Sequence, residues 1–242
     1  MLELKNLTVV YPDKTKAVDG FDLIINKGET AALLGANGAG KTSLLLAVVG
    51  ILELQSGTIE ADGILLSKKT VNEVRNRVGL VFQNPDDQLF MPYIYDDIAF
   101  GCRSLGLSED EIKIRVEETL DQLNIAHLGG RSSLKLSGGE KRMAAIAAVL
   151  AMRPSVLMFD EPTAFLDHRA KRALIEALKT LRHTKIIATH DMAFASEVCE
   201  RAVLLKNGRI AADGDLSLLH NEEIMRECGL EALAEGGYVK KS

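Results

Sequence analysis

A glycine-rich segment near the start of the chain carries the residue types that hold a chain of phosphates. Residues 35–42 read GANGAGKT and fit the pattern G-x-x-x-x-G-K-[ST]. Glycines let backbone N–H groups curl around phosphate oxygens, and the helix start adds partial positive charge. We expect Lys41 to contact the β- and γ-phosphates and the Thr42 hydroxyl to bind Mg²⁺. The residues expected to hold the nucleotide here are Asn37, Gly38, Ala39, Gly40, Lys41, Thr42 and Ser43.

Two adjacent carboxylates follow an apolar run far along the chain. Asp160 and Glu161 come directly after 156–159, which has the pattern of a buried strand. Such strands in open α/β sheets end at the ligand crevice. We expect Asp160 to be part of the ligand shell of Mg²⁺. Glu161 lies one residue further and is expected to act as general base on the water that attacks the γ-phosphate.

A second glycine-opened helix start lies roughly 100 residues after the first. Residues 136–140 read LSGGE and precede a helical run over 141–152. Free backbone N–H groups at such a terminus also suit an anion. One chain therefore carries two phosphate-binding helix termini. Two chains arranged head-to-tail would let each close over the nucleotide of the other.

Length and composition limit the classes of function. The 242 residues are 47% apolar and 26% charged, the balance of an ordinary globular protein. They fit one large domain with a subdomain better than two independent domains. The net charge of −5 gives no overall positive field for nucleic-acid phosphates. We expect no nucleic-acid partner.

The sequence shows no membrane-spanning stretch, no secretory signal and no cysteine framework, and we therefore expect a cytoplasmic chain. The longest apolar stretches, 44–52 and 144–152, are about nine residues long, whereas a membrane-spanning helix needs roughly 20. Residues 1–5 alternate like a strand and lack the features of a secretory signal. The three cysteines are far apart and form no CxxC pair, so we expect them to be reduced and structural: Cys102, Cys199 and Cys228.

Apolar periodicity predicts an α/β core interrupted by helices. Residues 108–111, Ser-Glu-Asp-Glu, form a capping box that predicts the start of a helix. Asn207-Gly208 predicts a tight hairpin. Two late strands flank a helix, and this βαβ alternation implies a parallel sheet. Strands are expected at 2–10, 21–26, 30–34, 57–60, 78–82, 156–159 and 185–188, a hairpin at 203–210, and helices after Gly35 through 52, within 93–152, at 169–181 and from 216 onward.

The order of these motifs resembles that of the ABC ATPases over nearly the whole chain. The motifs are 35–42, Gln83, 136–140, Asp160-Glu161, Leu166-Asp167 and His190. The resemblance implies the P-loop NTPase ABC fold: an α/β domain with a mainly parallel core sheet, an N-terminal antiparallel β subdomain and an inserted helical subdomain. It implies one domain, 1–242, with a core at about 1–83 and 152–215, a helical subdomain at about 84–151 and a tail at 216–242.

The resemblance also implies roles for single residues. Tyr11 matches the aromatic residue that stacks on adenine, and His190 the histidine at the γ-phosphate. Gln83 resembles the glutamine that senses Mg²⁺ and the attacking water. Catalysis is thus expected from Glu161, His190 and Gln83, metal binding from Thr42, Gln83 and Asp160, and contact with a partner's nucleotide from Ser137, Gly138, Gly139 and Glu140. Glu140 replaces the commoner glutamine, and Phe165 replaces a small residue.

Two further stretches resemble the ATPases of energy-coupling-factor importers, which take up vitamins and transition-metal ions. These are 82–90 and 96–101. Residues 86–90, 136–141 and 149–152 are most similar to the cobalt/nickel branch. The resemblance implies ATP and Mg²⁺ as cofactors, a second nucleotide-binding subunit of the same or a related chain, and membrane-embedded subunits. It implies a peripheral position on the cytoplasmic face of the cell membrane.

Other classes stay open at this point. A vitamin importer of the same type is one alternative. A non-transport ABC protein would usually carry a second cassette or a long coiled coil, and a small-molecule P-loop kinase would not explain 136–140. A non-hydrolytic ATP-gated clamp is another alternative. For a transporter, we expect the surface around 83–90 and 93–107 to receive a short helix from a membrane subunit. The apolar cluster of Leu89, Phe90 and Met91 favours this surface.

Overall fold

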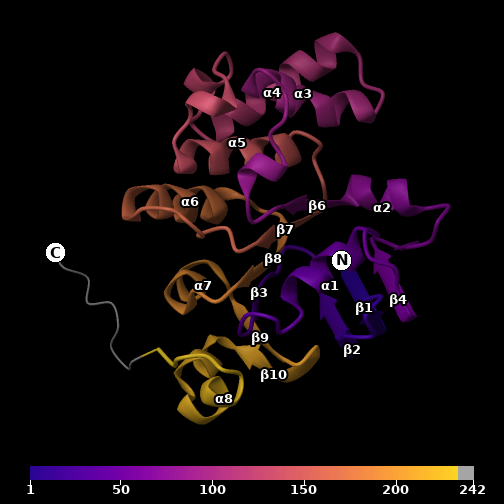
Figure 1. Ribbon diagram of the computed structural model, residues 1–242. Helices are drawn as coiled ribbons and strands as arrows, with labels where there is room; N and C mark the ends of the chain where they lie inside the picture. Colours follow the sequence, from indigo (N-terminus) through magenta and orange to yellow (C-terminus); the bar gives the residue numbers. More distant parts are fainter. Residues whose placement is uncertain (234–242) are drawn as a thin grey trace.

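Six strands form the larger of two sheets in the computed structural model, which describes residues 1–233 (Figure 1). Their order across the sheet is β10-β9-β3-β8-β7-β6. All neighbouring pairs are parallel except β9 and β10. The strands are β3 (Thr30–Leu34), β6 (Val78–Val81), β7 (Val156–Asp160), β8 (Thr184–Thr189), β9 (Arg201–Lys206) and β10 (Arg209–Asp215).

Both faces of this sheet are covered. Strand side chains alternate between faces, and β3 shows the consequence: Ala31 and Leu33 join one apolar core, while Ala32 and Leu34 join the other. A parallel sheet buried on both faces explains why its strands read as continuous apolar runs. The expectation of a βαβ core is confirmed.

The smaller sheet is antiparallel and built mainly from the N-terminal residues. Its order is β2-β1-β4-β5, with β1 (Leu2–Val10), β2 (Lys16–Ile25), β4 (Ser56–Ala61) and β5 (Ile64–Leu65). Its buried side chains share a core with α1 (Lys41–Val48). Strand β2 begins five residues before the expected start at 21 because Lys16 pairs with Val10 and Val18 with Val9. Its polar residues and Gly20, at φ 62°, hid this strand from the apolar pattern.

Three helices form a separate layer beyond β6, at the top of Figure 1: α3 (Ile94–Ser104), α4 (Glu109–Gln122) and α5 (Gly138–Leu150). Helix α4 begins with the expected capping box, in which Ser108 and Glu111 bond each other's backbone N–H. It buries Ile112, Val116 and Leu120, which are spaced four residues apart and so share one face. The expected helical insert is confirmed, with 3₁₀ turns between its helices.

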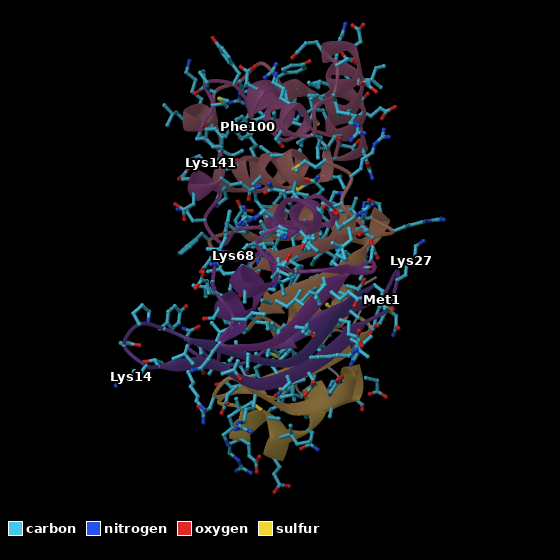
Figure 2. All side chains as sticks on the ribbon, turned by 90° about the vertical axis from the view of Figure 1, so that its right-hand side faces the viewer. Met1, Lys14, Lys27, Lys68, Phe100 and Lys141 are labelled. Atoms are coloured by element: carbon cyan, nitrogen blue, oxygen red, sulfur yellow. The ribbon has the colours of Figure 1, made fainter. Side chains whose placement is uncertain are left out.

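Part of the expected docking cluster belongs to the core of this layer. Leu89 is 5% exposed and packs among the buried residues of α3 and α5, so its assignment to a surface groove was wrong. The apolar surface consists instead of Phe90, which is 63% exposed, and Phe100 on α3. Their rings meet edge-on at 5.0 Å between centroids. Figure 2 labels Phe100 on the helical layer, with Lys141 of α5 below it.

Three of the remaining helices lie between strands in the chain: α2 (Val71–Arg77), α6 (His168–Thr180) and α7 (Met192–Val198). Helix α8 (Glu222–Glu227) follows the last strand. Helix α1 ends earlier than residue 52 because Gly50 adopts a left-handed φ of 66°, a common helix stop. In the tail, a 3₁₀ turn (Leu216–His220) precedes α8. The part of the expected helical tail from 234 to 242 lies outside the described residues. Within residues 1–233, no helix combines the length and apolar character of a bilayer span.

Candidate functional site

The glycine-rich loop joins β3 to α1, between a buried strand and a buried helix. Gly40 occupies the N-cap of α1 with a left-handed φ of 107°, and a side chain there would overlap the carbonyl oxygen of Ala17. Among the described residues, no hydrogen bond accepts from the backbone N–H groups of Gly40, Lys41 or Thr42. Three unpaired N–H groups at a helix start can bind an anion, and the loop can surround it.

Lys41 is folded back over this loop. It is 6% exposed, and its Nζ donates to the carbonyl oxygens of Gly35 at 2.7 Å and Ala36 at 3.3 Å. Its Nζ also lies 3.5 Å from Oε1 of Glu161. The ammonium group is thus held inside the pocket by the loop that would bind the phosphates, and its charge is available to a phosphate oxygen.

Thr42 and Asp160 meet although 118 residues separate them. The threonine hydroxyl donates to Oδ2 of Asp160 at 2.8 Å. The other carboxylate oxygen, Oδ1, is buried and has no hydrogen-bond partner among the described residues. Burial raises the pKa of Asp160, and the hydroxyl bond opposes this. A hydroxyl and an unsatisfied carboxylate oxygen fit Mg²⁺, which takes oxygen ligands and phosphates together.

Glu161 is held in a fixed orientation at the end of β7. Its φ is 42°, uncommon for a residue with a side chain, and its N–H donates to Ala188 of β8 at 2.8 Å. Oε2 accepts from the Thr189 hydroxyl at 3.1 Å and from the His190 N–H at 3.3 Å, and lies 2.9 Å from His190 Nδ1. These bonds to β8 and His190 hold the strained backbone in place, so that Oε1 of Glu161 faces Lys41. Oε1 is the carboxylate oxygen that can accept a proton.

These elements converge because their strands are neighbours. Strands β3, β8, β7 and β6 lie side by side and parallel, so their carboxyl ends share one edge. A pocket of about 480 Å³ opens at this edge. Its lining includes Tyr11, Gln83, Glu161, His190 and, from the phosphate loop, Asn37, Gly38, Ala39, Gly40, Lys41, Thr42 and Ser43. The Tyr11 hydroxyl lies 2.9 Å from the Ser43 hydroxyl, which fixes the aromatic ring at the pocket wall.

Three lining residues escaped the sequence analysis: Thr15, Lys16 and Ala17. Lys16 and Ala17 begin β2, and Thr15 precedes it. Strand β2 folds back along β1 so that Tyr11 N–H donates to Thr15 O at 2.9 Å. Their only signal in the sequence is the position of Lys16 a few residues after Tyr11. This spacing does not distinguish Lys16 from other surface lysines.

Arg142 on α5 also escaped the sequence analysis. It is 1% exposed and donates to the carbonyl oxygens of Phe82 at 2.6 Å and Gln83 at 2.5 Å. Gln88 adds a second link, because its side chain bonds both Phe82 N–H and Ala145 O. The segment that carries Gln83 is thereby fastened to α5, the helix whose N-terminus holds residues 136–140.

That N-terminus does not line the pocket of its own chain. Ser137 caps α5, and Oε2 of Glu140 accepts from both the N–H and the hydroxyl of Ser137, at 2.8 and 2.9 Å. Arg131 bonds the other Glu140 oxygen at 3.0 Å. The hydrogen bonds from the N–H and the hydroxyl of Ser137 lower the pKa of Glu140. Gly138 instead faces a second pocket beside Phe165. The two predicted phosphate-binding helix termini therefore belong to different surfaces of one chain.

Comparisons with known proteins agree with this geometry. Residues 18–164 match the family model described as ABC transporter. The energy-coupling factor transporter ATP-binding protein EcfA of Carboxydothermus hydrogenoformans is 42% identical over 234 residues, covering 96% of this chain and 87% of that protein. The structure of cbiO1 from Clostridium perfringens, described as part of the ABC transporter complex cbiONQ, gives a TM-score of 0.81 at 39% identity and covers 93% of each chain. A dimeric structure of the cassette MJ0796 in a post-hydrolysis state, bound to ADP and Pi, gives 0.79 at 26% identity and covers 89% of this chain and 99% of that chain.

Proposed function

The chain belongs to the ABC transporter family and is an ATPase, and on that premise we propose that it is the ATP-hydrolysing subunit of an energy-coupling-factor importer. The observation that carries the proposal is the pocket itself. It gathers a phosphate loop, a buried lysine and a braced carboxylate at one edge of the sheet.

Within the proposal, ATP binds with its adenine against Tyr11 and its phosphates in the loop of α1. Lys41 and the free N–H groups at the helix start stabilise the negative charge of the β- and γ-phosphates. Lys16, from β2, lies at the same pocket and adds a second positive charge. The adenine contact thus follows β1, and the phosphate contacts follow β3.

Glu161 is proposed as the general base for the attacking water. A base needs hydrogen-bond reach to that water, and the carboxylate faces the pocket near Lys41. Thr189 and His190 hold Oε2, which leaves Oε1 toward the phosphate site. His190 is proposed to contact the γ-phosphate, and Gln83 to orient the water.

Mg²⁺ would be held by Thr42 and Asp160, with Gln83, which follows the neighbouring strand β6. When bound, Mg²⁺ neutralises charge on the phosphate oxygens during transfer. The hydrogen bond from the Thr42 hydroxyl fixes the orientation of the Asp160 carboxylate. The unpartnered Oδ1 atom of Asp160 supports this assignment.

A second nucleotide-binding subunit is proposed to pair head-to-tail with this one. Ser137, Gly138, Gly139 and Glu140 then approach the nucleotide bound by the partner's loop. Two observations support this pairing: the helix terminus lies away from the pocket of its own chain, and the similar cassette MJ0796 is dimeric. To contact a phosphate oxygen, the Ser137 hydroxyl must turn its O–H, which now donates to Oε2 of Glu140, toward the partner's nucleotide.

Membrane-embedded subunits are the proposed second class of partner, on the cytoplasmic face of the membrane. Phe90 and Phe100 expose an apolar surface on the helical layer. An amphipathic helix that packs on this surface would gain ~25 cal/mol of binding free energy for each Å² of apolar area it buries. The link through Arg142 and Gln88 would carry movement of Gln83 to this layer. The sequence resemblance to the cobalt/nickel branch supports cobalt or nickel ions as the transported solute.

The proposal is tested by purifying tagged chain together with its membrane partners. We expect copurified membrane subunits that bind a metal ion, identified by elemental analysis, and ATP-dependent uptake after reconstitution into vesicles. Charged substitutions Phe90→Asp and Phe100→Asp should prevent assembly while basal hydrolysis by the isolated chain persists. Leu89→Asp is the contrasting core variant and should unfold the helical layer. Recovery of the chain with no membrane subunit, despite normal ATP hydrolysis, would contradict the transport role.

A further inference from the structure

Lys171 and Asp191 form an ion pair that has no part in the roles proposed above. Lys171 lies near the start of α6, and Asp191 is the N-cap of α7. The lysine Nζ donates to Oδ2 of Asp191 at 2.5 Å, and the two side chains are only 27% and 24% exposed. Partial burial reduces the screening of such a pair by salt and water, so it can hold its side chains in one geometry.

The pair joins two helices that both begin at the pocket edge of the sheet. Glu161 follows β7, and the chain then enters α6; His190 follows β8, and the chain then enters α7. Both helices bury side chains in the same apolar core, on one face of the sheet (Figure 1). Because β7 and β8 are neighbours, the ion pair links the same two chain segments that Glu161 and His190 link inside the pocket.

Asp191 fixes the backbone that carries His190. Its Oδ1 accepts from the Phe194 N–H at 3.0 Å, which caps α7, while its Oδ2 is the atom bound by the lysine. Its own N–H donates to the hydroxyl oxygen of Thr189 at 3.1 Å. The residues on the two sides of His190 are thus bonded to each other, and Asp191 anchors them to both helices.

The ring of His190 depends on this anchored backbone. The side chain is 62% exposed, and among the described residues Glu161 is the only hydrogen-bond partner of the ring. We propose that Lys171 is a positioning residue for His190: through Asp191 it holds the imidazole beside Glu161, in the orientation that a γ-phosphate contact needs. This inference rests on the proposed roles of His190 and Glu161 in ATP hydrolysis.

A second ion pair between the same helices provides a matched comparison. Arg172 follows Lys171 directly, and its Nη1 lies 2.5 Å from Oε2 of Glu197 in the last turn of α7. Within the described part of the chain, Glu197 forms no hydrogen bond with residues 189–191. Both pairs can fasten α6 to α7, but only the pair made by Lys171 reaches the backbone beside His190.

The first experiment compares Lys171→Met with Arg172→Met by phosphate release from the purified full chain over a range of ATP concentrations. Lys171→Met should lower kcat roughly 10-fold, less than the ~10²-fold that misplacement by a full ångström costs. KM for ATP should change little, because the phosphate loop is untouched. Arg172→Met should leave kcat and KM unchanged, and the two variants should unfold at similar temperatures. Lys171→Arg keeps the charge and should restore most of kcat.

The second experiment asks whether Lys171 acts through His190. Effects of residues that act together are not additive, whereas independent losses multiply. His190→Ala removes the ring, so adding Lys171→Met to it should change the single-turnover rate by less than about twofold. A further loss of roughly 10-fold in the double variant would show that Lys171 acts independently of His190 and would overturn the proposal.

The remaining failures are distinguishable. Turnover in His190→Ala equal to that of the native chain would remove the proposed role of His190, and the positioning role of Lys171 with it. A loss in His190→Ala together with native turnover in Lys171→Met would overturn the positioning role alone. Equal losses in Lys171→Met and Arg172→Met would also overturn it, because both pairs would then serve only to fasten α6 to α7.

Discussion

Lys41 and Glu161 face each other inside the pocket, with 3.5 Å between the lysine Nζ and the carboxylate Oε1. Both are less than one-tenth exposed. One supplies the positive charge that phosphates need, and the other supplies a proton acceptor. A γ-phosphate bound by Lys41 would therefore lie within reach of a water activated by Glu161.

Replacing Glu161 with Gln should lower ATP turnover at least ~10²-fold, the loss expected when general-base assistance disappears. Gln keeps the side-chain size, so ATP affinity should stay close to that of the native chain. Phosphate release at saturating ATP and titration with a fluorescent nucleotide measure the two quantities. Glu118→Gln, an exposed change on α4, is the control. Near-normal turnover in Glu161→Gln would reassign the base.

Replacing Lys41 with Met should weaken ATP binding about 10- to 100-fold, because hydrogen bonds to charged groups contribute about 1.5–3 kcal/mol. Calorimetric titration with ATP measures this change. Lys68→Met, at a lysine side chain that is 95% exposed, should bind ATP as the native chain does. Equal affinities in the two variants would remove Lys41 from the phosphate site.

Replacing Thr42 with Val removes the hydroxyl that faces Mg²⁺ and bonds Asp160. The Mg²⁺ concentration for half-maximal ATP hydrolysis should rise at least ~10-fold, the lower end for disturbing a metal site. Binding of ATP in the presence of EDTA should change little, which separates a metal defect from a nucleotide defect. Thr180→Val, at the exposed end of α6, is the control. An unchanged Mg²⁺ requirement would argue against Thr42 as a ligand.

Replacing Arg142 with Met should lower the free energy of unfolding by about 2–5 kcal/mol, because two buried carbonyl groups lose a charged donor. Burial lowers the pKa of Arg142 to about 10, so the side chain remains charged at neutral pH. Urea unfolding measures the loss. Arg153→Met breaks only an exposed ion pair with Glu118 and should lower it by less than about 1 kcal/mol. Similar losses in both variants would show that Arg142 does not fasten Gln83 to α5.

Glu29 provides a prediction about pH. Burial alone would raise the pKa of Glu29, but hydrogen bonds from Arg201 and Asn26 outweigh it and hold the pKa below its ordinary value of 4.5. A lowered pKa in the folded chain stabilises the fold above about pH 4.5, and the benefit is lost as the pH falls through the folded value.

Glu29→Gln should therefore be less stable than the native chain at pH 7, by about 1 kcal/mol. The difference should shrink as the pH falls below about 4.5 and through the lowered pKa of Glu29. Thermal unfolding across this range measures it, with Glu53→Gln, at an 88% exposed side chain, as the control. A difference that is constant with pH would mean that Glu29 acts without its charge.

Local patterns in the sequence predicted most of the elements and the phosphate loop. Strands 2–10 and 30–34, the capping box at Ser108 and the helix start at 136–140 agree with the structure because each depends on neighbours within a few residues. The pair Asp160-Glu161 follows its strand directly, so its place at a sheet edge was also predictable. The first residues of β2, before Phe21, and helices α2 and α7 were not, since their apolar residues are few or interrupted.

Contacts between distant residues were decided by the tertiary structure alone. The hydrogen bond between Thr42 and Asp160 spans 118 residues and exists because β3, β8 and β7 are neighbours in the sheet. Whether Leu89 or Phe90 faces solvent depended on which side of the loop α3 and α5 cover. The sequence by itself determined which groups can bind phosphate, since one contiguous loop supplies them. It did not determine the pairing of Lys41 with Glu161 or the exposure of Phe165, because strand order and the packing of the helical layer are set by long-range burial.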